Sequence, residues 1–136
     1  MKSVLVDTNV ILRFLLGDHP EYSSAATKLF AAAEQGEVTL SIEPMIVAEC
    51  CYVLEGQVYQ LSKELIASHL VPVLVHDGVQ CEHLLTVLDA LQIYVENHLD
   101  FTDAYLIALA RNTDQVVATF EKKMMGVEGV SFRDLN

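Results

Sequence analysis

Positively charged residues are scarce in this chain: its 136 residues include 8 Lys and Arg against 19 Asp and Glu, a formal net charge of −11. Apart from the pair Lys122-Lys123 the cations are scattered, so no basic stripe is present to attract a phosphate backbone. A conventional nucleic-acid-binding surface is therefore disfavoured. The acidic balance could suit a cationic partner, but composition alone favours a role in solubility.

Long hydrophobic runs are missing too, since no apolar segment approaches the roughly 18 residues that a membrane-spanning helix needs. We therefore expect no membrane association, and the apolar start before Asp7 is too short for a signal peptide. The three cysteines (Cys50, Cys51 and Cys81) form no CxxC pair, and the five histidines show no zinc-ligand spacing. Reduced thiols and a cytoplasmic location are predicted.

What the chain does contain is a regular alternation of strand-like and helix-like patterns. Its hydrophobic content of 52% excludes disorder, and its length predicts one domain over residues 1–136. The alternation predicts an α/β fold with a mainly parallel central sheet of about four or five strands and six or seven helices. The expected strands are 3–6, 38–41, 79–81, 115–118 and 126–132, and the expected helices are 10–16, 20–36, 44–54, 62–74, 84–95 and 100–110.

Two acids directly follow expected strands. Asp7 comes after the first strand and Glu121 after the strand at 115–118. In an open parallel sheet, ligands collect at the carboxyl ends of the strands, where these side chains would lie. Asp7 could equally be a cap of the following helix, and Glu121 an exposed loop acid.

Two further acids lie in apolar helices. Glu49 is the only charged residue between Pro44 and Leu54, and a carboxylate in a buried helix is unfavourable unless it is paired or binds a cation. It could also reach solvent at a groove edge, or be buried and neutral. Asp103 could simply complement the helix dipole beside a cap at Asp100.

Taken together, the four acids favour a cation site. Carboxylates gathered in one crevice repel one another, which destabilises the fold. A hard divalent ion such as Mg²⁺ or Mn²⁺ relieves this repulsion, since such ions prefer oxygen ligands. Metal ions of this kind activate water and stabilise the leaving oxygen in phosphodiester cleavage.

The order and surroundings of these acids resemble those of PIN domains, of the type found in VapC-like toxins of toxin–antitoxin pairs. The resemblance covers essentially the whole length. Its strongest pieces are residues 6–13 (VDTNVILR), Ala48-Glu49 within its apolar helix, and residues 101–104 (FTDA), and its weaker piece is residues 117–121 (VATFE).

This resemblance implies a PIN-like fold, with the sheet sandwiched between helices, and an Mg²⁺- or Mn²⁺-dependent endoribonuclease site. Asp7, Glu49 and Asp103 would be metal ligands, with Glu121 as a fourth acid. Supporting roles would fall to Thr8, Asn9 and Thr119. The implied partners are an RNA substrate, a second copy of the chain in a homodimer, and an antitoxin protein with a basic or aromatic tail.

One departure from the family pattern concerns the second metal position. The family usually has a pattern like Thr-Phe-Asp-x-Asp-Phe here, whereas this chain has Glu121 followed by Lys122, Lys123 and Met124. A cation at Lys123 leaves open an alternative function, a PIN-like interaction protein that binds a partner or RNA with weak or no cleavage. A phosphatase of the HAD type is disfavoured, because Asn9 stands where that class needs a second aspartate.

Overall fold

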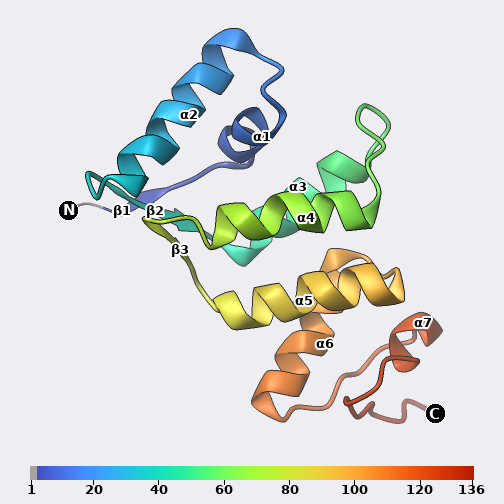
Figure 1. Ribbon diagram of the computed structural model, residues 1–136. Coiled ribbons are helices and arrows are strands. Elements are labelled where there is room, and N and C mark those ends of the chain that lie inside the picture. Colours follow the sequence, from blue (N-terminus) through green and yellow to red (C-terminus); the bar gives the residue numbers. More distant parts are fainter. Residues whose placement is uncertain (1–2) are drawn as a thin grey trace. The chain divides into compact units, whose positions relative to one another are not determined.

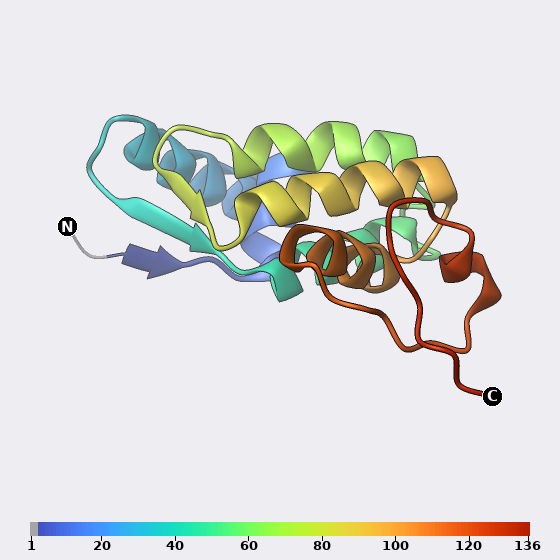
Figure 2. The same cartoon turned by 90° about the horizontal axis from the view of Figure 1, so that it is seen from below.

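The computed structural model describes residues 3–136, which fold as an α/β chain (Figures 1 and 2). The chain forms two compact units, one ending at Leu84 and the other formed by Leu85–Asn136. The prediction of one domain over residues 1–136 therefore stays a prediction. The elements are β1 (Ser3–Leu5), α1 (Thr8–Leu16), α2 (Pro20–Glu34), β2 (Thr39–Ile42), α3 (Pro44–Glu55), α4 (Lys63–Leu74), β3 (Val79–Cys81), α5 (Leu84–Asn97), α6 (Phe101–Thr113) and α7 (Lys122–Met125).

The first unit is built on a parallel sheet of three strands in the order β1-β2-β3. Val4 pairs with Leu40, and Leu40 with Val79, so these three side chains share one face. Leu40 and Ile42 are buried on that face, while α2 packs on β2 and α4 on β3. Alternation along the strands therefore buries one face in the core of this unit.

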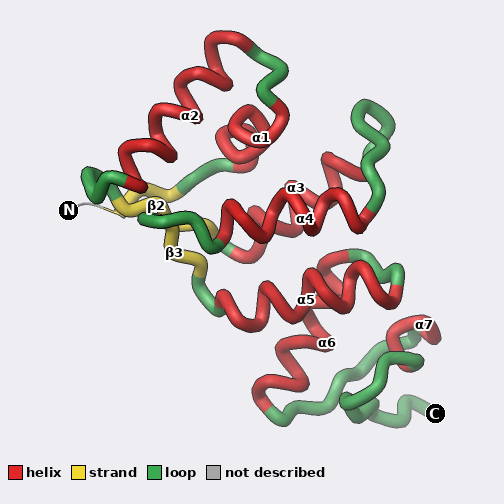
Figure 3. Tube along the Cα trace, in the orientation of Figure 1, coloured by secondary structure: helices red, strands yellow, loops and turns green. Residues whose placement is uncertain are grey.

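Two of the expected strands do not form. Residues 115–118 and 126–132 contribute a single parallel bridge between Val117 and Phe132, and the stretch after α6 is loop apart from the short turn of α7 (Figure 3). Val117 is 8% exposed whereas Val116 is 58% exposed, so only one valine of the pair is buried. Within residues 3–136 the sheet thus has three strands, fewer than the four or five predicted, while the parallel α/β class is confirmed.

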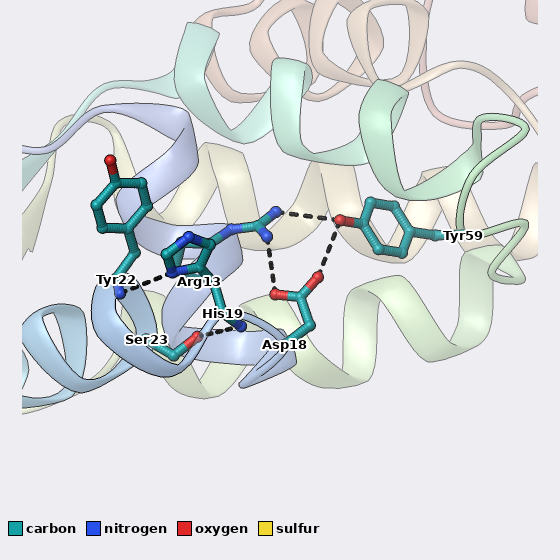
Figure 4. A network of polar contacts seen from close by, with 6 residues as sticks. All are labelled: Arg13, Asp18, His19, Tyr22, Ser23 and Tyr59. Atoms are coloured by element: carbon teal, nitrogen blue, oxygen red, sulfur yellow. Dashed lines mark hydrogen bonds and ion pairs between the residues drawn. The ribbon is translucent and has the colours of Figure 1, made fainter.

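A polar network fixes the carboxyl end of α1. The Arg13 guanidinium donates hydrogen bonds to Asp18 Oδ1 at 2.8 Å and to Tyr59 OH at 3.1 Å, and Tyr59 OH donates to Asp18 Oδ2 at 3.2 Å (Figure 4). The bond with Tyr59 is the largest influence raising the pKa of Arg13; burial opposes it and Asp18 adds to it. The network joins α1 to the loop after α3, and so orients the helix that begins beside Asp7.

Every helix within residues 3–136 is too short or too polar to cross a bilayer.

Candidate functional site

Asp7 stands at the carboxyl end of β1 and caps α1. Its backbone is extended, and its Oδ1 accepts a hydrogen bond from Thr8 N at 2.8 Å. The side chain is exposed to solvent. The cap uses one carboxylate oxygen, so capping and a ligand role are compatible at this residue.

Thr8 carries an unsatisfied buried polar atom. The residue is 4% exposed, and its Oγ1 has no hydrogen-bond partner among residues 3–136. A buried hydroxyl left unpaired costs about 1–3 kcal/mol, so such groups usually meet a water or a ligand. This orphaned oxygen beside Asp7 fits the supporting role predicted for Thr8. Asn9, the next supporting residue, is exposed and lines a groove of about 390 Å³ with residues of α1 and α2.

Glu49 is exposed on α3, so the expectation of a helix buried on nearly every face is wrong. The buried face consists of Val47, Cys50, Cys51 and Leu54. Met45 and Tyr52 are exposed although they are apolar, and they made the helix resemble a core element. The unfavourable burial that suggested a ligand is therefore absent at Glu49, and its ligand role stays a prediction.

The buried thiol of Cys50 lies within electrostatic reach of Asp7 and Glu49, the two predicted ligands of the first unit. Burial raises its pKa to about 12, and electrostatic interactions with Cys51, Glu49 and Asp7 add to the shift in that order. Two predicted ligands from α1 and α3 are thus within electrostatic reach of one thiol, and these two helices pack together. At neutral pH the thiol is protonated, so Cys50 is a core residue and not a nucleophile.

The second unit holds the other two predicted ligands. Asp103 lies half-buried in the first turn of α6, and burial, then Asp100, then Glu121 raise its pKa above the ordinary value. Glu121 caps α7 through a bond from Lys123 N to Oε1 at 3.2 Å. Thr119 Oγ1 accepts from Glu121 N at 2.9 Å, so Thr119 holds the backbone of this turn. Two further carboxylates, Asp100 and Glu121, therefore lie within electrostatic reach of Asp103.

Asp100 is a candidate that the sequence reasoning treated only as a cap. It precedes α6, but its side chain makes no capping hydrogen bond, and it contributes to the raised pKa of Asp103. The spacing of three residues between Asp100 and Asp103 is the signal that could have identified it, because such residues are neighbours at a helix start.

The donor chemistry of these residues suits a hard divalent cation, since it consists of carboxylate oxygens and the orphaned Thr8 hydroxyl. Across residues 3–136, however, no group of three or more His, Cys, Asp or Glu side chains is placed so that it could hold a metal ion. The carboxylates occur as one set near Cys50 and another near Asp103. The residues fit such an ion in chemistry, while the complete ligand set remains a prediction.

Neutralising Asp103 should stabilise the protein in the absence of metal. The raised pKa means that ionisation is less favourable in the folded state than in the unfolded state. The folded state therefore gains stability below the ordinary Asp pKa of about 4 and loses it as pH rises through the folded pKa. In chelator at pH 7, Asp103→Asn should unfold at higher urea concentration than the parent, and the difference should shrink as pH falls toward about 4. A constant difference across this range would contradict the assigned cause.

Lys123 is exposed, and its Nζ donates to the main-chain oxygen of His98 at 3.0 Å. It forms no ion pair with a carboxylate of the described chain, residues 3–136. We therefore expect Lys123→Gln to change Mn²⁺ affinity by less than about fivefold, because exposed charge pairs contribute under about 1 kcal/mol. Calorimetric titration measures this, with Lys28→Gln on α2 as the control. Tightening by two orders of magnitude would show that Lys123 competes with the metal.

These features define a small α/β protein with a parallel sheet and carboxylates at a strand end and on the helix starts. The family model described as PIN domain matches residues 4–129, and the chain belongs to the PIN domain family. The PIN fold is generally a nuclease fold, and its nucleases generally use divalent metal ions. A search among curated proteins finds no match.

Proposed function

We propose that the chain is a metal-dependent endoribonuclease of the VapC-like toxin type, which hydrolyses phosphodiester bonds of RNA. The observation that carries this proposal is the PIN match over residues 4–129, which includes all four predicted acids. The orphaned Thr8 hydroxyl beside Asp7 supports a ligand at that end of the sheet. The proposal is tested by incubating the protein with single-stranded RNA in Mn²⁺ and in chelator. Cleavage only in Mn²⁺ is expected.

Each residue has a distinct part in this chemistry. A bound Mg²⁺ or Mn²⁺ ion would supply the attacking hydroxide and neutralise the phosphate. Asp7, Glu49 and Asp103 would hold the ion through carboxylate oxygens, with Glu121 as the fourth acid. Thr8 Oγ1 would donate a hydrogen bond to a ligand of the pocket, and Thr119 fixes the turn that carries Glu121.

The partners of such a toxin are part of the proposal. A net charge of −11 favours a partner with a basic tail, so the antitoxin would cover the acidic site with a basic or aromatic segment. We further propose that the chain acts as a homodimer in the cytoplasm. The absence of a CxxC pair among the three cysteines supports a reducing compartment.

A second candidate function is a PIN-like interaction protein that binds a partner or RNA and cuts weakly or not at all. It is favoured by Lys123, which stands where a second acid often lies, and by the lack of a three-residue ligand group within residues 3–136. Binding of RNA without cleavage at any Mn²⁺ concentration would favour this function over the first.

Divalent ions should raise the thermal stability. A ligand that binds only the folded state stabilises it by RT ln(1 + [L]/Kd), roughly 2.7 kcal/mol at a hundredfold excess over Kd. The melting temperature should rise in millimolar Mn²⁺ and return to its starting value with excess chelator. An unchanged midpoint in a calorimetric or fluorescence melt would argue against any metal site in the native protein.

A further inference from the structure

A groove of about 400 Å³ near the carboxyl end of the chain combines aromatic and cationic side chains. Phe120 and Phe132 line it together with Lys122 and Arg133. Three of the chain's 8 Lys and Arg residues lie within residues 122–133, so this is the segment where the scarce positive charge gathers. Proteins use this combination to bind single-stranded nucleic acids, because the bases stack on aromatic rings and the phosphates contact cations.

The walls of the groove are held by main-chain hydrogen bonds. Val117 N donates to Ser131 O at 3.0 Å, and Arg133 N donates to Val117 O at 2.8 Å. These bonds fix the segment before Phe120 against the segment that carries Phe132 and Arg133. The Thr119–Glu121 turn lies at the same place, because Thr119 also lines the groove. A ligand in the groove would therefore lie beside the turn that presents Glu121.

The side chains that would recognise a ligand are available. Phe120 is 85% exposed, so its ring is accessible to a ligand. Neither Lys122 nor Arg133 forms an ion pair with any residue in 3–136. One acid lines the groove, Asp134, and its Oδ1 already accepts a hydrogen bond from Asn136 N at 2.9 Å.

Two other grooves lack this combination. In the groove along α1 and α2, the one cation is Arg13, which is already bonded to Asp18 and Tyr59. In a groove of about 420 Å³ beside α5, Arg111 is bonded to the Glu128 main-chain oxygen and faces the carboxylates of Asp89, Glu96 and Glu128. Among these three, only the carboxyl-terminal groove therefore offers both unpaired cations and an exposed phenyl ring.

We propose that this groove holds one unpaired nucleotide of an RNA strand, with its base stacked on Phe120 and a flanking phosphate at Lys122 and Arg133. The inference rests on the proposed function, because the strand is the nuclease substrate and the groove would place it beside Glu121. An unpaired strand is required, since a base in a duplex has both faces covered by its neighbours and cannot stack on a side chain.

Binding is measured in chelator, so that no cleavage occurs. Fluorescence anisotropy of a labelled short single-stranded oligoribonucleotide is recorded with the parent, with Phe120→Ala and with the double variant Lys122→Gln, Arg133→Gln. Phe120→Ala should weaken binding roughly 5- to 150-fold, the range for loss of one base–aromatic stack. The double variant should lower the slope of log K against log salt by about 0.7 for each phosphate that is no longer neutralised. Phe120→Tyr should bind as the parent does, because it keeps an aromatic ring at this position. Duplex RNA should compete poorly with the labelled single strand.

The matched controls are Tyr52→Ala, an aromatic residue 80% exposed on α3, and Lys28→Gln, an exposed lysine on α2. Both should bind RNA as the parent does. Equal affinity of the groove variants and the parent, no binding by the parent, or equal competition by duplex RNA would each overturn the proposal. Cleavage in Mn²⁺ by the same proteins separates the two claims. If the parent cleaves RNA and the groove variants bind RNA as tightly as the parent, the groove proposal fails while the proposed nuclease function stands.

Discussion

Neutral replacements of the predicted ligands should abolish cleavage of RNA. Asp7→Asn, Glu49→Gln and Asp103→Asn keep the size of each side chain but remove the charge that would hold a divalent ion. Each should lower the Mn²⁺-dependent cleavage rate by more than the roughly 10- to 100-fold typical of losing a residue that only supports a metal ligand. Initial rates on a single-stranded RNA measure the effect, and calorimetric titration should show weaker Mn²⁺ binding in each variant.

The controls for this series are Asp77→Asn and Glu64→Gln, both exposed carboxylates outside the predicted site. They should cleave at the parent rate. In chelator, at least one of the three site variants should be more stable than the parent, because it relieves repulsion between carboxylates. If cleavage survives in all three and each is less stable without metal, the carboxylates are helix caps and polar pairs, and the proposed function fails.

The largest loss of stability should come from Gly78→Ala, in the turn before β3. Gly78 has φ +82°, and a Cβ there would overlap the carbonyl oxygen of Ala33 and lie 2.6 Å from its carbonyl carbon. Its own carbonyl accepts from Leu40 N at 2.8 Å, so the turn cannot move without loosening β2. Strain in the left-handed region and overpacking should together cost roughly 2–5 kcal/mol. Urea unfolding followed by circular dichroism measures the free energy of unfolding.

Gly36→Ala is the matched control for this prediction. Gly36 has φ +79°, but nothing lies within 4 Å of the position that a Cβ would take. The Gly36→Ala variant should therefore lose only the free energy that the left-handed backbone conformation costs a residue with a Cβ, roughly 1–2 kcal/mol. The difference between the two variants isolates the contact with Ala33. If both variants lose a similar free energy of unfolding, the turn at Gly78 rearranges to accept the methyl group, and the contact with Ala33 contributes little.

Elements that local signals define could be predicted from the sequence closely. The helix expected at 44–54 is α3 (Pro44–Glu55), and the strand expected at 79–81 is β3. Proline at a first helical turn and glycine after the last turn mark such ends locally, as Pro44 and Gly56 do for α3. The strands expected at 115–118 and 126–132 depended on long-range pairing, which valine content alone does not determine, and only the bridge at Val117 formed.

In the candidate site, too, local features could be predicted from the sequence and tertiary ones could not. The position of Asp7 at a strand end follows from its neighbours in sequence, and the structure places it there. The burial of the helix around Glu49 on nearly every face was predicted from apolar composition, which does not say which apolar side chains reach the core. Met45 and Tyr52 are exposed, and Glu49 lies among the exposed residues of α3. The influence of Glu121 on Asp103 depends on a tertiary contact that no sequence pattern reveals, whereas the spacing of Asp100 and Asp103 is visible in the sequence.

The parallel sheet has a consequence for how the chain is made. The hydroxyls of Ser3 and Ser41 meet at 3.0 Å although they are 38 positions apart in sequence, and both α1 and α2 lie between them. Two strands so far apart in sequence can pair only after the loop between them closes. Because this closure costs entropy before any pairing stabilises the sheet, such pairing is slow. During synthesis β1 leaves the ribosome before β2, so its backbone groups are unpaired until β2 has emerged. In this interval the first strand is open to mispairing with other nascent chains.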